Sequence, residues 1–423
     1  MLAPKKKHQP FYILLLLILA GEAVFILPFV LARIFRPTVL DLFQLTNFEL
    51  GACFSIYGIV AFVSYPLGGT LADKFQPRIL LTAGLLLTAL GGLVYATFPS
   101  YTLLKVLYGY WGFTTIFLFW AAMIKATRVW GGASKQGIAY GLLDGGRGLV
   151  AAAFGSLGVF IFSLFIISEI SVATISERKE AFRYVILISS AIIASVGVLI
   201  YLFLKPQQND VVSEVRKNRK EVIGLYKTAL KLPSVWLLMV IILCAYVGYK
   251  VTDVFSLYAN EVMLFNEIDS AQVGAFMLYI RPVVGVGIGL LADRTKASFL
   301  MLIGFVIIFI GAMLFASGII GPNMSVLFFV SLVITATGVY AYRTLYFAAM
   351  REGKIPLAIT GTAVGLMSLV GYTPDIFAGP VMGYLLDTYP GETGHQYVFV
   401  MLGIFSLIGL IASVSYYRIA KRN

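Results

Sequence analysis

The chain has 423 residues; 60% of them are hydrophobic, only 12% are charged, and the mean hydropathy is +0.91. Soluble globular proteins carry roughly 25% charged residues, so this composition excludes a soluble enzyme. The net charge of +12 comes from basic residues in short segments between long apolar runs, which argues against binding of nucleic acid. We therefore expect a membrane protein that contacts lipid over most of its surface.

Twelve apolar segments of bilayer-crossing length follow one another along the chain. We expect helices, because hydrocarbon requires every backbone N–H and C=O to be paired, and these runs are apolar on all sides. The first run follows three lysines but is too long for the apolar part of a signal peptide, so we interpret it as an uncleaved span. The predicted spans are 11–35, 49–71, 79–98, 102–126, 137–166, 184–204, 234–260, 272–292, 298–319, 325–349, 357–386 and 396–417.

Most of the 32 Lys and Arg residues lie in the two tails and in the loops on the same side as the tails. The positive-inside rule therefore predicts that both termini are cytoplasmic. The longest polar segment, 205–232, contains the basic stretch Arg216–Lys220, which suits either an anionic lipid surface or a solvated connection. We predict a six-helix bundle at 1–204, a cytoplasmic basic linker at 205–232 and a second six-helix bundle at 233–423.

Short sequences recur in the same order in the two halves, between 220 and 227 residues apart. Three matches in register indicate an internal duplication. The matched segments are Gly69–Lys74 with Gly289–Arg294, Trp120–Met123 with Phe347–Met350, and Gly137–Gly141 with Gly361–Gly365.

Charged residues are concentrated in some of the predicted spans and missing from others. The third, sixth, ninth and twelfth spans contain no Asp, Glu, Lys or Arg. An ionised side chain at the bilayer centre costs roughly 2.5–3.5 kcal/mol or more, so it persists where it meets water, a partner or a substrate. The pattern predicts a wet interior lined by the remaining helices. The charges away from the ends of those helices are Glu22, Asp144, Arg147, Lys250, Asp253, Arg281, Arg343 and Asp375.

Two pairs of opposite charge lie three residues apart and so share a helix face: Asp144 with Arg147, and Lys250 with Asp253. Each is either an internal ion pair or part of a binding site.

Arg281 and Arg343 have no acidic residue within four positions. They either pair across helices with Glu22, Asp253 or Asp375, or meet an anionic substrate, to which arginine can donate two hydrogen bonds. Tyr340, Tyr342 and Tyr346 are expected to surround Arg343 with hydroxyls, or to be plain packing residues. The substrate-binding candidates are Arg147, Lys250, Arg281, Arg343, Tyr249 and Tyr346.

The chain has no ATP-binding loop, so active transport would use a gradient. The two histidines, His8 and His395, are expected in a tail and a loop, which leaves carboxylates as proton carriers. We expect Glu22 to be the foremost carrier, because no basic residue lies within ten positions; it could instead pair with Arg281 or Lys250. The proton-coupling candidates are Glu22, Asp144, Asp253 and Asp375.

No metal, cofactor or enzymatic activity is expected. Cys53 and Cys244 both fall inside predicted helices, where small core residues are the expected interpretation. No nucleophile–base pair or metal-ligand cluster is recognisable in the sequence.

The segment that starts at Gly69 and continues through Asp73, Lys74 and Arg78 resembles the loop 2–3 signature of the major facilitator superfamily. A weaker copy sits where that family has its second one. The resemblance implies an all-α membrane protein with twelve transmembrane helices in two pseudo-symmetric six-helix bundles, which rock around a midplane site. It also implies a cytoplasmic gate formed by Asp73, Lys74, Arg78, Asp293 and Arg294.

Within the superfamily the chain looks most like the sugar-phosphate and organophosphate permease branch and related poorly characterised bacterial permeases. This implies a bacterial inner membrane. The chain departs from that branch in one respect: the branch carries a phosphate-binding arginine midway through its first helix, where this chain reads Phe25–Phe29. A cation occurs instead in the seventh helix, at Lys250.

The arginines and Lys250 favour secondary active transport of a small organic anion, such as a sugar acid or sugar phosphate, by alternating access with proton symport. We expect a monomer whose partners are its substrate, membrane lipid and protons. One alternative is proton-driven efflux of amphipathic compounds, which the aromatic content of 14% suggests. Another is a non-transporting membrane sensor, which would bind ligand without flux.

Overall fold

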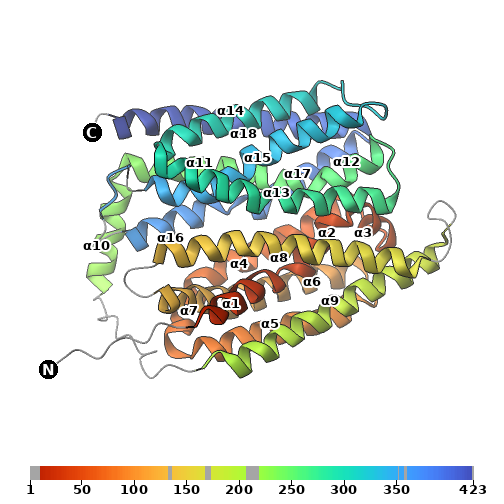
Figure 1. The fold of residues 1–423 in the computed structure, drawn as a ribbon, viewed down its shortest axis with the longest axis horizontal. Helices are drawn as coiled ribbons and strands as arrows, with labels where there is room; N and C mark the ends of the chain where they lie inside the picture. The colour runs from red at the N-terminus through yellow and green to blue at the C-terminus, as the bar shows by residue number, and fades with distance from the viewer. Residues whose placement is uncertain are drawn as a thin grey trace.

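The computed structural model describes residues 10–131, 136–166, 173–205, 219–350, 352–356 and 360–421. Within these residues every regular element is a helix. Most of the helices run along the long axis of the molecule (Figure 1). The first half contains α1 (Phe11–Ala23), η1 (Ile26–Val30), α2 (Leu31–Ile34), α3 (Arg36–Leu42), α4 (Asn47–Lys74), α5 (Pro77–Tyr95), α6 (Tyr101–Gly112), η2 (Phe113–Trp120), α7 (Ala121–Gly131), α8 (Gln136–Phe165) and α9 (Ile175–Phe203).

The second half follows the polar segment and repeats this series of long helices. It contains α10 (Arg219–Leu230), α11 (Pro233–Val251), η3 (Thr252–Val254), α12 (Phe255–Glu261), α13 (Glu267–Arg294), α14 (Ala297–Ala316), α15 (Ser325–Ala349), α16 (Thr360–Gly371), α17 (Pro374–Thr388) and α18 (Glu392–Lys421).

Ten helices of the described residues are long and apolar enough to cross a membrane, and an eleventh candidate is a bent pair, Phe11–Ala23 with Ile26–Ile34, which turns by 41°. The all-helical, multi-pass prediction is therefore confirmed. The predicted span 357–386 is instead two shorter helices, α16 and α17. They separate at residues 372 and 373, just before Pro374, whose ring removes one of the backbone N–H groups that a continuous helix would use. A count of twelve requires these two helices to be taken as one span.

The internal duplication is visible in the helix boundaries. Helices α4 and α13 each have 28 residues. The first is capped by the Thr46 hydroxyl, which accepts from the Glu49 N–H, and the second by Asn266, which accepts from the Asp269 N–H. The first residues of α4 and α13 are 220 positions apart, and so are their last residues. Helices α5 and α14 start with the same offset. The repeat is thus a property of whole helices.

The helices form two layers, one from each half, and α4, α8, α13 and α17 lie between the outer helices (Figure 1). Helices α5 and α9 lie at one outer edge and α14 and α18 at the other, which agrees with the prediction from their lack of central charges. Both α1 and α18 have their chain ends on the same side of the molecule, together with α10. We call this the terminal end, and the opposite end, which carries α2, α3 and α12, the distal end.

Two segments that the sequence places outside the apolar spans contain helix. The predicted linker contains α10, which packs against α11 and α16 at the terminal end; part of its basic stretch, 216–218, lies outside the described residues. Helix α9 starts at Ile175, so Arg178 and Arg183, which were expected beside the sixth span, belong to its first turns. Hydropathy marks only the apolar part of a helix. It does not show the polar turns by which a helix continues beyond that part.

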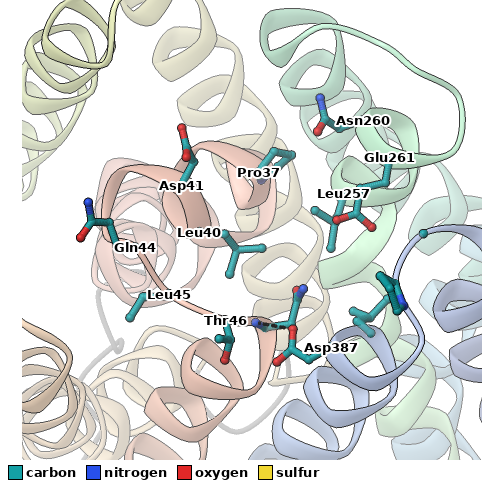
Figure 2. Close-up of a pocket in the computed structure, with 14 residues that line it drawn as sticks. Pro37, Leu40, Asp41, Gln44, Leu45, Thr46, Leu257, Asn260, Glu261 and Asp387 are labelled. Carbon is teal, nitrogen blue, oxygen red and sulfur yellow. Dashed lines mark hydrogen bonds between the residues drawn. The ribbon is translucent and has the colours of Figure 1, made fainter.

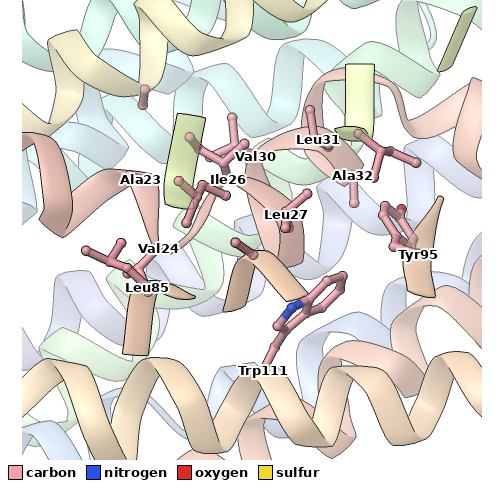
Figure 3. Close-up of a cluster of buried hydrophobic side chains, with 14 of the residues drawn as sticks. Ala23, Val24, Ile26, Leu27, Val30, Leu31, Ala32, Leu85, Tyr95 and Trp111 are labelled. Carbon is pink, nitrogen blue, oxygen red and sulfur yellow. The ribbon is translucent and has the colours of Figure 1, made fainter. Parts of the chain in front are cut away.

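Each half has its own core, a cluster of buried hydrophobic side chains. The first is built mainly from α1–α9 and includes Leu27, Leu85 and the fully buried Trp111 (Figure 3). The Trp111 indole N–H donates to the Thr88 carbonyl at 3.2 Å, which satisfies its polar atom inside the core. The other hydrophobic cluster is built from α10–α18. Cys53 and Cys244 are buried in these cores as free thiols.

Candidate functional site: two buried charge clusters

The first group of buried charges, the central cluster, consists of Glu22, Asp144, Arg147, Arg281 and Arg343. The Arg147 Nε lies 3.1 Å from the Glu22 Oε2, and an Arg281 nitrogen lies 4.0 Å from the same oxygen. The Asp144 Oδ1 lies 2.9 Å from an Arg281 Nη and 3.6 Å from an Arg343 Nη. Helices α1 and α8 come from one half, whereas α13 and α15 come from the other. The central cluster therefore joins the two halves.

The geometry answers two questions about this cluster that the sequence left open. Asp144 and Arg147 do not neutralise each other along α8, because each reaches a nearer partner on another helix. Glu22 has a basic partner, Arg147, although none is near in sequence. The alternative that Glu22 pairs with Arg281 is confirmed only as a longer contact of 4.0 Å.

The central cluster has more positive than negative groups: three guanidiniums face two carboxylates. The Asp144 side chain is 36% exposed and that of Arg343 is 17% exposed, whereas Glu22 and Arg281 are nearly closed off. Among the described residues, the buried Nε atoms of Arg281 and Arg343 have no hydrogen-bond partner. Surplus positive charge and unused N–H donors beside a partly exposed carboxylate favour the binding of an anion.

Aromatic rings contact the same cations. The Arg147 guanidinium lies 5.4 Å from the centre of the Phe25 ring and 5.5 Å from that of Trp120. The Arg343 guanidinium lies 4.8 Å from the centre of the Tyr249 ring. Such cation–π contacts orient a guanidinium without consuming its N–H donors.

The tyrosines near Arg343 divide into two groups. The Tyr346 hydroxyl lies 3.4 Å from that of Tyr372, and Tyr340 packs edge-on against Tyr249. Tyr342 is different: its hydroxyl donates to the Met301 carbonyl, and it is fully buried against α14. The expectation that Tyr342 surrounds Arg343 is wrong, because successive residues on a helix point in directions about 100° apart.

The second group of buried charges, the second cluster, consists of Arg33, Lys250, Asp253 and Asp375. The Lys250 Nζ lies 3.2 Å from Asp253 and 3.4 Å from Asp375, and the Arg33 Nε lies 2.5 Å from Asp253. The Tyr246 hydroxyl donates to Asp375 at 3.0 Å. The predicted pair of Lys250 with Asp253 is confirmed. Two cations face two carboxylates, and Asp375 is the most exposed member at 14%. This cluster is charge-balanced.

Arg33 was not selected from the sequence, because it stands near the end of the first predicted span. The helix bends at η1, next to Pro28, and α2 then carries Arg33 to η3 of the other half. Its Nη1 donates to the Tyr249 hydroxyl at 3.1 Å. The one available signal was the proline ahead of it, since a proline within a helix bends the chain.

The two halves are joined tightly at the distal end. The Arg178 guanidinium donates two hydrogen bonds to Glu267, at 2.6 and 2.7 Å, and lies 2.8 Å from Asp41. The Asp387 carboxylate accepts the backbone N–H groups of residues 47 and 48 at 2.9 and 2.7 Å, and so caps α4 from the opposite half (Figure 2).

Helices α4 and α17 stay in contact from the distal end to the middle of the molecule. A Cβ on Gly51 would collide with the Gly379 carbonyl, and one on Gly58 would come within 2.8 Å of the Asp375 backbone. Glycine at these places allows the helices to approach closely. Beyond the middle the two helices lie farther apart: a Cβ on Gly69 would meet nothing within 4 Å among the described atoms.

Helices α8 and α13 behave in the same way. A Cβ on Gly148 would lie 3.1 Å from Pro282, and the Ser156 and Tyr279 hydroxyls lie 2.8 Å apart. Toward the terminal end, a Cβ on Gly141 or Gly145 would meet nothing within 4 Å among the described atoms. The halves are therefore joined at the distal end and separated at the terminal end.

A pocket of about 720 Å³ lies at the distal end, between α3, α12 and the end of α17 (Figure 2). Asp41, Asn260 and Glu261 are among the residues that line it. Within the part of the chain that the structure describes, its lining includes none of the predicted substrate-binding residues. It lies beside the Asp387 cap and is separate from the central cluster.

The predicted gate residues lie at the terminal end, at the ends of α4 and α13 and the start of α5. Asp73, Lys74 and Arg294 are exposed, and the Arg78 guanidinium lies 4.1 Å from the centre of the Tyr201 ring. Only the backbone of Asp293 is described. Among the described side chains, no ion pair links these residues across the halves, in keeping with the separation at this end.

The expectation that His395 lies in a loop is wrong. It is fully buried in the first turns of α18, and its Nε2 lies 2.9 Å from the Glu261 Oε2. The other histidine, His8, lies outside the described residues.

A sequence model of the Major Facilitator Superfamily matches residues 11–377. Two Escherichia coli K12 proteins are similar over most of both chains. Inner membrane protein YihN is 27% identical, covering 96% of each chain, and inner membrane protein YqcE is 24% identical, covering 84% of this chain and 83% of its own.

Solved structures show the same fold. A bacterial homologue of the human lysosomal transporter Spinster, inward-facing and unoccupied, has a TM-score of 0.76 at 15% identity and covers 99% of both chains. The nucleoside transporter NupG has a TM-score of 0.70 at 15% identity, covering 96% of this chain and 99% of its own. The chain is a multi-pass membrane protein that belongs to the Major Facilitator Superfamily.

Proposed function

We propose that the protein is a secondary active transporter of a small organic anion, such as a sugar acid or a sugar phosphate, and that it works by alternating access. The observation that carries this proposal is the excess of guanidinium over carboxylate in the central cluster. Arg147, Arg281 and Arg343 meet there between the two halves, and two carboxylates leave one positive charge uncompensated. An anion would restore the balance.

In this proposal the substrate contacts residues from both halves. Arg281 and Arg343 bind its charged group, and Arg147, Tyr249 and Tyr346 position the remainder. Lys250 was a further candidate, but its two carboxylate partners favour a structural role in the second cluster. Binding groups on both sides of an interface allow one substrate to be exposed to either side of the membrane in turn.

The proposed energy source is a proton gradient, which drives the anion across the membrane by symport. The carboxylates Glu22, Asp144, Asp253 and Asp375 are the candidate carriers. Asp144 is favoured over the others, since it is the most exposed and contacts two arginines. A proton on this carboxylate and an anion on those arginines would support each other.

We further propose that the terminal end faces the cytoplasm of a bacterial inner membrane and that the protein acts as a monomer. Lys and Arg in the tails and adjoining loops support this orientation. The separated terminal end then corresponds to an inward-open state, with Asp73, Lys74, Arg78, Asp293 and Arg294 as the open cytoplasmic gate. The similar fold of the inward-facing Spinster homologue supports the same assignment.

The test is uptake of radiolabelled compounds into proteoliposomes with and without an inward proton gradient. The compounds should include sugar acids, sugar phosphates, neutral sugars and amphipathic cations. We expect uptake of at least one anion, stimulated by the gradient. Uptake confined to cations would contradict the proposal and favour efflux of amphipathic compounds. Anion binding without flux would instead indicate a sensor.

A further inference from the structure

We propose that Asp144 is a built-in competitor of the substrate: its carboxylate occupies the anion site between Arg281 and Arg343 when no substrate is bound. Substrate enters when Asp144 is displaced or takes up a proton. This inference rests on the proposed function, because it concerns the same arginines. It adds that one residue of the protein sets both the affinity for the anion and its dependence on pH.

The first support is geometric. A single oxygen of Asp144 lies 2.9 Å from Arg281 and 3.6 Å from Arg343. These arginines belong to different helices, α13 and α15, and converge on one negatively charged group. A carboxylate, phosphate or sulfonate of a substrate would find the same two guanidiniums at the same point.

The second support is accessibility. Asp144 is 36% exposed, whereas its partner Arg281 is 5% exposed, so the carboxylate is the member of this pair that solvent reaches. Among the described atoms, a Cβ on the neighbouring Gly145 would meet nothing within 4 Å. We infer that the exposed Asp144 side chain has room on this side of α8 to turn away from the arginines.

Other buried carboxylates do not meet these conditions. Asp253 also contacts two cations, but its side chain is 4% exposed and both cations are compensated by the second cluster. Glu22 is 5% exposed and packs under Arg147. Asp144 is thus the carboxylate of the central cluster that a solute can reach.

The charges that face Asp144 determine the effect of its protonation. Arg281 and Arg343 face it from α13 and α15, Arg147 shares its helix, and Glu22 lies behind Arg281 on α1. With Asp144 neutral, three guanidiniums face only Glu22, so the attraction for an anion increases. An anion then binds together with a proton. The protein cannot bind the anion strongly while the ionised Asp144 carboxylate still contacts Arg281 and Arg343.

The test uses the full-length protein with Asp144→Asn. As the matched control we choose Asp269→Asn, which removes one carboxylate at the distal start of α13, far along the helix from Arg281. Two properties are measured: equilibrium binding of gluconate and glucose 6-phosphate at acidic and at neutral pH, and the rate at which phenylglyoxal modifies Arg281 and Arg343, followed by mass spectrometry. The second property needs no knowledge of the natural substrate.

We expect Asp144→Asn to bind an anion about tenfold more tightly at neutral pH and to lose the pH dependence of binding, because the competing charge is gone. Its arginines should also be modified several-fold faster, and Asp269→Asn should resemble the wild type. If Asp144→Asn is poorly folded, Asp144→Ser removes the same charge with a smaller side chain and should give the same results.

The outcomes separate this inference from the proposed function. If the wild type binds an anion and Asp144→Asn has the same affinity, pH dependence and modification rate, only the role of Asp144 is refuted. If only the variant binds an anion, the competitor role is supported in its strongest form. If neither protein binds an anion and their arginines are modified at the same rate, both the proposed function and this inference are wrong.

Discussion

The central cluster and the second cluster contain the same kinds of side chain, and both link the two halves, yet they differ in two respects. The second cluster has equal numbers of cations and carboxylates, none more than 14% exposed, whereas the central cluster has one surplus guanidinium and a carboxylate that is 36% exposed. Burying charges is costly unless they are compensated. A buried cation in a transporter is therefore best judged by the balance and accessibility of its whole cluster.

The largest expected effect is on substrate binding in the central cluster. Arg343→Ala or Arg281→Ala should lower anion uptake by about 100-fold, since each removes a charged donor from a largely desolvated site. The lysine variants should recover only part of the activity, because an ammonium group cannot donate two parallel hydrogen bonds. Proteoliposome uptake measures this effect. Near-normal uptake by either alanine variant would mean that the arginine is structural.

The next effect is on stability, and it belongs to the second cluster. Asp253→Ala should lower the free energy of unfolding by about 3 kcal/mol, because Arg33 then lacks its partner and Lys250 loses one of two. Unfolding in SDS, followed by circular dichroism, measures the change. The double variant Arg33→Met with Asp253→Leu should recover much of the loss, since Lys250 keeps Asp375. A double variant as unstable as the single one would contradict the balance argument.

A smaller effect is expected for the ion pairs that close the distal end. Arg178→Ala removes contacts with Glu267 and Asp41, and because the Asp41 side chain is 53% exposed, water screens part of this attraction and we expect a change of about 1 kcal/mol. That change shifts the ratio of conformations a few-fold toward separation at the distal end. Spin-label distances between α3 and α12 report it. Glu267→Gln should act in the same direction, and unchanged distances in both variants would exclude a gating role.

The smallest effect on stability is expected at the terminal end. Asp73 is exposed at the end of α4, so Asp73→Asn should change the free energy of unfolding by less than about 0.5 kcal/mol. Uptake should nevertheless fall, because the proposed gate must close in another step of the cycle. Equal uptake by the variant and the wild type would remove Asp73 from the gate.

Much of the fold could be predicted from the sequence, because apolar runs, basic loops and a repeat of 220 residues depend only on chain order. The placement of charges in interior helices was predictable for the same reason. The pairing of those charges was not. Glu22 meets Arg147, and Arg33 meets Asp253, through helix rotation and a bend at η1 that sequence spacing does not encode.

The pair of Lys250 with Asp253 could be predicted because both residues lie on one helix face. His395 could not be placed, since it lies one residue before the predicted span and its burial depends on Glu261 of a different helix. Local patterns therefore identify which residues are buried charges, whereas partners are set by tertiary packing.

The central claim is that the surplus guanidinium charge between the halves binds an anion. The most direct measurement is a thermal-shift screen of the purified wild type and of Arg343→Ala against matched sets of metabolite anions, cations and neutral sugars. The account predicts stabilisation of the wild type by one class of anion, and loss of that response in a variant that is still folded. Stabilisation by cations or neutral compounds alone, or an unchanged anion response in Arg343→Ala, would contradict it.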